Sequence, residues 1–312
     1  MSLKFFIGVT DQNWFQHLSN IQPDEVNFWQ PGGKQTFKAI QKNDMFLFKL
    51  HSPHNFIVGG GFFVRHSFLP VSLAWEAFGI KNGMTDYISF RNGIHKYRKS
   101  DFRSEPDPTI GCIILALPFF FEKRDWIPVP EDWKPNIVQG KTYSTDTEIG
   151  LALYGKVQEK LDPLSYWDSE YVMEINESNR YGSGQTVYPR IGQGTFKVIV
   201  TEAYHRRCAI TGEKTLPVLE AAHIKPYSQN GPHLTSNGLL LRKDMHTLFD
   251  RGYITINEEL QIEVSNRLKE DYGNGKEYYA FHGKRLAEIP EQQNERPSTQ
   301  FLRWHNENVY LA

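Results

Sequence analysis

Short apolar runs, each closed by glycine, proline, asparagine or aspartate, dominate the first 120 residues and restrict how this part of the chain can fold. The runs are KFFIGVT, DMFLFKL, FIVGGGFFVR and TIGCIILALPFFF. Runs of this length between turn residues are typical of β-strands, and none approaches the roughly 18 apolar residues of a membrane-spanning helix. We therefore expect a closed or strongly curved sheet, with a bulge or a close backbone approach at Gly59–Gly61.

Two segments of the first 190 residues have helical spacing instead. PVSLAWEAFGI can place Leu73, Ala77 and Phe78 on one face, and TEIGLALYGKVQEKLDPL is typical of a helix that Pro163 ends. A polar, Gly- and Ser-rich stretch follows. With 312 residues the chain exceeds the usual size of one domain. We expect an α+β protein with a β-rich domain over 1–140, a helical linker over 141–188 and a second domain over 189–312.

Charge and cysteine content narrow the class of protein. The net charge is −1, but residues 186–252 carry 9 Lys and Arg against 5 Asp and Glu, so a nucleic-acid partner is permitted without being required. The 2 cysteines lie far apart in the sequence, which argues against a disulfide framework. The N-terminus leads directly into a strand pattern without a cleavable signal. We expect a soluble cytoplasmic protein with no membrane partner.

The second domain combines residues that suit phosphodiester hydrolysis. FKVIVTEAYHRR should be helical, PVLEAAHI a strand, RKDMHTLFDRG a second helix and YITINEELQIEVS a hairpin. His223 lies at the end of the strand, where a neutral imidazole could deprotonate water. Asn237 ends the long loop and could hold that loop or orient the imidazole. His246 and Asp250 share one helical face and could chelate a single ion.

The run from Arg190 to Gly252 resembles the HNH, or ββα-metal, nuclease family. The matching motifs are C-A-x-T-G, A-A-H-I, S-N-G-L-L-L and H-x-L-F-D-R-G, which here are Cys208–Gly212, Ala221–Ile224, Ser236–Leu241 and His246–Gly252. The resemblance implies that His223 is the general base, Asn237 the middle Asn and His246 a metal ligand. It also implies a divalent ion, Mg²⁺ or Mn²⁺, with Ni²⁺ or Co²⁺ as further candidates.

The sequence departs from this family at two places. Many members carry a metal-binding Asp or His directly before the base, where this chain has Ala222. We expect Asp250 to complete the metal shell, with Glu220, two residues earlier on the same strand face, as the second choice. Some relatives bind a structural zinc through four cysteines, but Cys208 has no cysteine nearby, which excludes such a site.

Each of these residues also has a structural interpretation. A single His on a strand is usually structural, Asn before Gly usually marks a turn, and His233 in the loop should be solvated. It is the combination of residue types and spacing that favours a nuclease. Cations would face the DNA backbone or be plain solvated surface, namely Lys225, Arg242, Lys243 and Arg251.

The first domain resembles the EVE branch of the PUA-like superfamily, on the segments FFIGVTDQNWFQHL, FWQPGG, NDMFLFKL and FIVGGGFF. This resemblance implies a β-barrel that extrudes a modified base into an aromatic pocket. Trp14 and Trp29 lie beside strand ends and Trp75 lies on a helix-like segment, although packing is the commoner fate of Trp. Arg98 and Lys99, in a basic cluster, could contact the DNA backbone.

Together the two resemblances imply a modification-dependent, type IV restriction endonuclease. It would cut double-stranded DNA that contains 5-methylcytosine or 5-hydroxymethylcytosine, and as a homodimer it could cut both strands. One alternative is a non-catalytic reader of modified nucleic acid with a degenerate HNH domain, which Ala222 favours. Another is an HNH nuclease whose N-terminal domain binds RNA or a protein.

Overall fold

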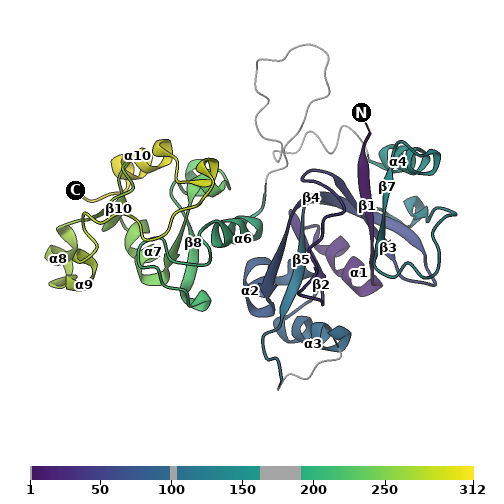
Figure 1. The fold of residues 1–312 in the computed structure, drawn as a ribbon, viewed down its shortest axis with the longest axis horizontal. Coiled ribbons are helices and arrows are strands. Elements are labelled where there is room, and N and C mark those ends of the chain that lie inside the picture. The colour runs from purple at the N-terminus through teal and green to yellow at the C-terminus, as the bar shows by residue number, and fades with distance from the viewer. Residues whose placement is uncertain (1, 99–103, 162–190) are drawn as a thin grey trace, which may run out of the picture. The chain divides into compact units, whose positions relative to one another are not determined.

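The computed structural model describes residues 2–98, 104–161 and 191–312, and the chain divides into two compact units, Met1–Gly192 and Gln193–Ala312. Lys99 and the Gly/Ser-rich part of the expected linker lie outside the described residues. The fold is a mixed α+β one, as expected (Figure 1). None of the helices in the described part of the chain combines the length and the apolar character needed to cross a bilayer.

A mixed sheet forms the centre of the first unit. Its strands are β1 (Lys4–Thr10), β2 (Glu25–Gln30), β3 (Met45–Leu50), β4 (Phe56–Pro70), β5 (Thr109–Phe120), β6 (Ile127–Pro128) and β7 (Gly140–Ser144). They pair in the order β2-β5-β4-β3-β1-β7, with β6 on β4. β1 and β3 are parallel and the other pairs are antiparallel. No pairing among the described residues joins β2 to β7, so the closed barrel stays a prediction.

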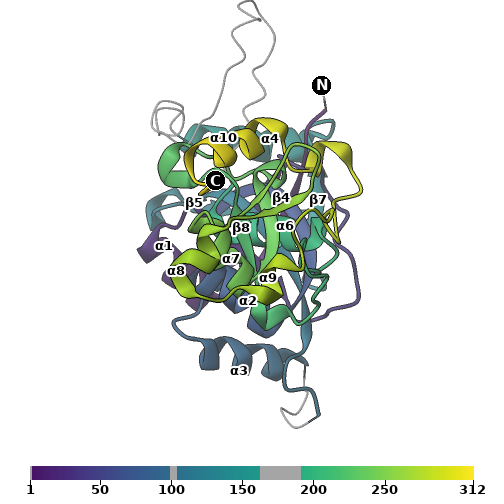
Figure 2. The ribbon, with the colours of Figure 1, turned by 90° about the vertical axis from the view of Figure 1, so that its left-hand side faces the viewer.

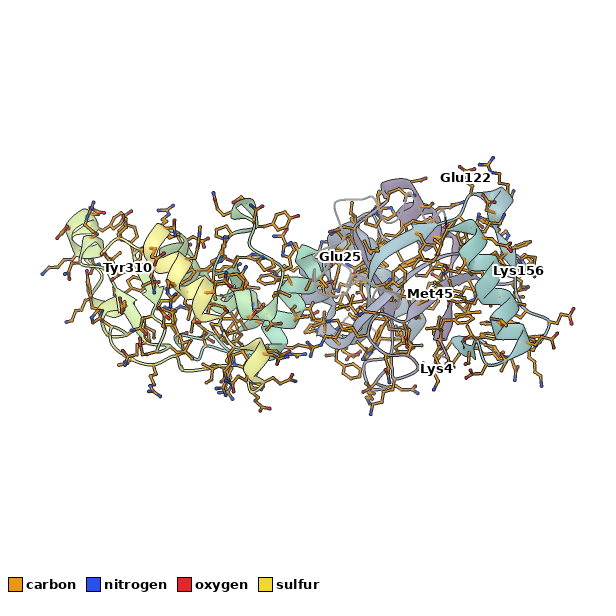
Figure 3. All side chains as sticks on the ribbon, turned by 90° about the horizontal axis from the view of Figure 1, so that it is seen from above. Lys4, Glu25, Met45, Glu122, Lys156 and Tyr310 are labelled. Atoms are coloured by element: carbon orange, nitrogen blue, oxygen red, sulfur yellow. The ribbon has the colours of Figure 1, made fainter. Side chains whose placement is uncertain are left out.

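In the described part of this unit, four α-helices accompany the sheet: α1 (Gln12–Ile21), α2 (Val71–Phe78), α3 (Tyr87–Arg98) and α4 (Glu148–Lys160). The expected helices at PVSLAWEAFGI and TEIGLALYGKVQEKLDPL are confirmed as α2 and α4. In Figure 3, Lys156 on α4 and Glu122 point outward, whereas Met45 lies among the strands and is buried. β7 pairs with β1, so the first unit continues beyond residue 140.

The expected irregularity at Gly59–Gly61 is confirmed. A Cβ atom at Gly59 would lie 2.2 Å from the carbonyl oxygen of Phe119, and one at Gly60 would lie 2.7 Å from the carbonyl oxygen of Phe46. The register between β3 and β4 shifts next to this point. Glycine is needed here because the neighbouring backbones leave no space for a side chain.

The second unit contains two hairpins and several helices, with its own apolar core. Its elements are α6 (Gln193–Ala203), β8 (Leu219–His223), β9 (Gly238–Arg242), α7 (Lys243–Asp250), β10 (Ile254–Ile256), β11 (Ile262–Val264), α8 (Arg267–Tyr272), α9 (Lys276–Tyr279) and α10 (Thr299–Asn308). The expected strand, helix and second hairpin are confirmed, but the segment expected as one long loop ends in strand β9. α7 ends before Gly252, whose φ of +77° favours glycine. In Figure 2 this unit faces the viewer.

Candidate active site

The centre of the site is the β8–β9 hairpin followed directly by α7. The two strands are antiparallel, and His223 at the end of β8 pairs with Gly238 at the start of β9. Because α7 starts at the residue after β9, its side chains return toward β8. This ββα arrangement brings His223 and His246 into one small region from positions 23 apart in the sequence.

His223 contacts two other aromatic rings. Its imidazole stacks on Phe196 of α6, with ring centroids 3.8 Å apart and 10° between the planes. Its Nε2 atom lies 2.9 Å from Nδ1 of His233. Burial, with smaller contributions from His233 and His246, lowers the pKa of His223 to about 4. The ring is therefore neutral at neutral pH, as a proton acceptor must be.

His233 takes part in the site, in contrast to the solvated state that the sequence suggested. Besides its bond to His223, its ring stacks on Tyr227 with centroids 4.8 Å apart. Neither Tyr227 nor Phe196 was expected near the base. The signal for His233 was its position inside the loop that links β8 to β9, but its partner depends on how that loop closes.

Asn237 closes that loop. Its side chain is fully buried; Oδ1 accepts from the backbone N–H of Lys225, and Nδ2 donates to the carbonyl oxygens of Lys225 and Pro232, each at 2.9 Å. Three backbone groups are thus satisfied by one amide. Of the two roles considered from the sequence, these bonds correspond to holding the loop.

His246 lies between two carboxylates. Its Nδ1 atom is 2.9 Å from Glu220 on β8, and its Nε2 atom is 3.2 Å from Asp250, one turn further along α7. Partial desolvation raises the pKa of Asp250, His246 lowers it and Glu220 raises it, and the net result is an increase. The structure therefore brings together the three side chains that the sequence suggested as metal ligands.

These donors suit a divalent cation in their chemistry. Imidazole and carboxylate groups bind Mn²⁺, Ni²⁺ and Co²⁺, and carboxylates bind Mg²⁺. However, within the described ranges no group of three or more His, Cys, Asp or Glu side chains is already arranged as a metal site. The three side chains satisfy each other through His246 instead. The donor set fits an ion chemically, and its side chains would have to turn toward a common point.

Ala222 lies directly before the candidate base. It is fully buried in the core of the unit and, by strand alternation, lies on the same face of β8 as Glu220. The carboxylate that reaches His246 therefore comes from two residues earlier on that face. Cys208, by contrast, has a structural role, since its Sγ atom accepts hydrogen bonds from the backbone N–H groups of Thr211 and Arg242.

The cations expected near DNA have different environments. Arg242 forms a bidentate ion pair with Asp244 at 2.6 and 2.7 Å, and Lys243 lies 3.9 Å from Glu220. In the first unit, Arg98 bonds to Glu105 and to two backbone carbonyls, so it supports its own fold. Lys225 lies beside Trp304 of α10, with its Nζ atom 5.6 Å from the ring centroid.

The first unit has a cavity of about 110 Å³ that includes two of the three expected tryptophans. Trp14, Trp29, Asp11, His51 and Tyr97 are among its lining residues. Trp14 is 2% exposed and packs edge-on against Phe28 and Phe48, so most of it belongs to the core. Trp29 is half-buried and its Nε1 donates to the carbonyl of Asn82. Trp75 does not line this cavity; it packs on Tyr87 and Phe90.

Comparison with known proteins gives one family match. Residues 208–257 match the family described as HNH endonuclease. Among solved structures, a modification dependent TagI restriction endonuclease is 14% identical, with 92% of this chain and 77% of that chain covered and a TM-score of 0.28. A mutant of the ZmASCH protein from Zymomonas mobilis is 7% identical over 48% of this chain and 96% of that chain, with a TM-score of 0.31. At these TM-scores neither structure carries an argument. No curated protein sequence matches.

Proposed function

We propose that the whole chain is a metal-dependent endonuclease that cuts DNA containing modified cytosine, and the match of residues 208–257 to the HNH endonuclease family supports the nuclease part. The observation that supports this most strongly is the neutral His223 on the same ββα unit as the Glu220–His246–Asp250 cluster. A proton acceptor and a set of cation ligands are the two parts that phosphodiester hydrolysis requires.

In the proposed mechanism His223 removes the proton from the attacking water. Its Nε2 atom faces Nδ1 of His233, so its own Nδ1 atom is left for the water proton. Stacking on Phe196 fixes the plane of the ring, and Asn237 fixes the loop from which His233 projects. These contacts hold the base in one orientation before substrate binds.

Glu220, His246 and Asp250 would hold the divalent ion, Mg²⁺ or Mn²⁺ with Ni²⁺ or Co²⁺ as further candidates. When bound, the ion would neutralise charge on the scissile phosphate and on the departing oxygen. To bind the ion, His246 would exchange its present pairing with the two carboxylates for one ring nitrogen on the metal. Asp250 on the same helical face and Glu220 on β8 then supply oxygen ligands.

The first unit would select the DNA. Its cavity combines the ring of Trp29 with polar groups on Asp11, His51 and Tyr97, which suits a flat polar ligand such as an extruded base. We propose 5-methylcytosine or 5-hydroxymethylcytosine as that base, and a PUA-like, EVE-type domain as the reader. Since one HNH site cuts one strand, a double-strand break would come from a homodimer or from two binding events.

The test uses plasmids that differ only in cytosine modification, incubated with the protein and Mg²⁺, Mn²⁺, Ni²⁺ or Co²⁺. We expect cleavage of the modified plasmid only, abolished by EDTA. His223→Ala should reduce the rate by about 100-fold or more, since general-base catalysis contributes about 10²–10⁴-fold. His54→Ala, which changes an exposed turn residue of the first unit, is the matched control. Cleavage by His223→Ala at the wild-type rate would show that the base is misassigned.

A second candidate function is a reader of modified DNA without catalysis. It is favoured by Ala222 and by the mutual pairing of the metal-ligand candidates. A protein that binds modified DNA but cuts neither plasmid with any of the four metals would be this reader. Equal cleavage of modified and unmodified plasmids would instead favour a nuclease whose first unit binds RNA or a protein.

A further inference from the structure

A groove of about 290 Å³ lies between the loop that follows β8 and one face of α10. Its lining includes Lys225 from the loop and Gln300, Phe301, Trp304 and Glu307 from α10. Lys225 is only two residues after His223, and two residues of extended chain span about 7 Å. The groove is therefore next to the candidate base.

α10 is fixed to the catalytic domain although it lies outside the segment that matches the family. The backbone N–H of Ser298, directly before the helix, donates to the carbonyl of Ser236 at 2.9 Å. His305 stacks on Phe249 of α7 at 3.8 Å, and its Nε2 donates to the Phe249 carbonyl at 3.1 Å. These buried contacts use one face of α10. The positions 300, 304 and 307 share another face, which lines the groove.

Lys225 has the character of a phosphate contact. Asn237 fixes its backbone through two hydrogen bonds, so the start of its side chain is well positioned. Within the described residues no ion pair of its ammonium group is found, and the centroid of the Trp304 ring lies 5.6 Å from its Nζ atom. The other cation of the groove, Arg303, already forms a bidentate pair with Glu258 at 2.9 and 3.0 Å.

We propose that this groove binds a strand of the substrate DNA next to the scissile phosphate. Lys225 contacts a backbone phosphate, and the indole of Trp304 packs against a neighbouring base or sugar. A cation beside a partly exposed ring suits a nucleic-acid strand, because the cation pairs with the phosphate and every base has a flat face for stacking. Continuity with the candidate base selects DNA as the occupant. The proposal rests on the nuclease function proposed above.

The test measures DNA binding without cleavage. Oligonucleotides, single-stranded and duplex, are titrated in EDTA against protein carrying His223→Ala, over a range of salt concentrations. Adding Lys225→Ala should lower the affinity and reduce the slope of log K against log salt by about 1, since one phosphate contact is lost. Adding Trp304→Ala should lower the affinity by about tenfold or more with the slope unchanged, because stacking is worth about 1–3 kcal/mol per base.

The controls use the same domain. Lys284, whose Nζ atom lies 5.8 Å from the Phe281 ring centroid, is a matched lysine–aromatic pair, so Lys284→Ala should leave affinity and slope as they were. Trp304→Phe keeps an aromatic ring and should retain most of the affinity. Circular dichroism of Trp304→Ala checks that this variant is folded, so that a loss of affinity is not caused by misfolding.

Three outcomes would overturn the proposal. The first is an unchanged DNA affinity in Trp304→Ala, and the second is an unchanged salt slope in Lys225→Ala. The third is a Trp304→Ala variant in which only the molecular mass measured by sedimentation changes, because the groove would then be a contact between copies of the chain. The proposed nuclease function fails differently. In that case the wild-type protein would cut no plasmid, while these binding measurements would still give the expected pattern.

Discussion

The contact between the imidazoles of His223 and His233 determines which ring nitrogen of the proposed base can accept a proton. For Nδ1 of His223 to accept a proton, Nε2 must carry one and donate it to Nδ1 of His233. His233 thereby selects the tautomer of its neighbour, as a carboxylate or a backbone carbonyl does in other sites. When His223 becomes charged during the reaction, this hydrogen bond becomes charge-assisted and stronger.

His233→Ala should therefore slow cleavage by about tenfold or more, because the base loses its orientation while keeping its identity. The effect should fall on kcat rather than on KM, and His233→Asn, which offers a carbonyl acceptor, should restore part of it. Single-turnover rates for the three proteins check this. Equal rates in all three would mean that His233 only fills space against Tyr227.

The protonation of His223 determines how the cleavage rate depends on pH at the acidic end. Its pKa is about 4, below the ordinary 6.5, so the ring stays unprotonated as pH falls from 8 to about 5. We expect kcat/KM, measured at saturating metal, to lose little activity to this group over that range. A sharp decline centred near pH 6.5 would show that the imidazole is not desolvated when the enzyme works.

Asn237→Ala should destabilise the second unit by about 2–4 kcal/mol. The substitution leaves the Lys225 N–H and two carbonyls without their buried partner. Each unsatisfied group costs about 1–3 kcal/mol, and water that enters and hydrogen-bonds to these groups reduces the total. Asn237→Asp should also destabilise, since a carboxylate cannot donate to the two carbonyls. Urea denaturation followed by circular dichroism measures both, and wild-type stability in Asn237→Ala would contradict the role of this amide.

At the scale of elements, apolar spacing was enough to predict α2, α4, β8, α7 and the β10–β11 hairpin. It was enough because each of these elements packs apolar side chains into a core, and this burial determines the spacing of its apolar residues. The same reasoning missed the stack of Phe196 on His223, since that contact joins α6 to β8 through tertiary packing. It also gave no expectation for α10, whose apolar positions are few and whose anchor, His305, is polar.

His305 should make the stability of the second unit depend on pH. Burial lowers its pKa to about 4, and it is 2% exposed. The unfolded chain, with a pKa near 6.5, binds the proton more readily, so stabilisation is complete above pH 6.5 and is lost as pH falls toward 4. At about 1.4 kcal/mol per pKa unit the loss approaches about 3 kcal/mol.

Thermal unfolding between pH 7 and pH 4 measures this dependence. His223 acts in the same direction, so the two variants His305→Ala and His223→Ala should each remove part of the slope. The second serves as the internal comparison because His223 lies on β8, away from α10 in the sequence. A slope that neither variant changes would assign the pH dependence to other groups.

At the scale of the whole molecule, the chain divides into two compact units, and we propose that one selects the DNA and the other cuts it. Trp29→Ala should abolish the preference for modified DNA while metal-dependent cutting by the second unit persists. Trp75→Ala changes a tryptophan of the same unit that does not line the cavity, so it should keep the preference. Relative cleavage of modified and unmodified plasmids decides this, and loss of preference in Trp75→Ala alone would move the pocket elsewhere.

The position of α10 also bears on when the enzyme can become dangerous to its own cell. During synthesis the β8–β9 hairpin and α7 leave the ribosome about 50 residues before α10 does. Until that helix arrives, Phe249 lacks the ring that covers it, and the residue beside Asn237 lacks the hydrogen bond from Ser298. A nascent chain would therefore carry the proposed catalytic side chains in an unfinished frame, and the proposed ability to cut DNA would be acquired after the first unit has emerged.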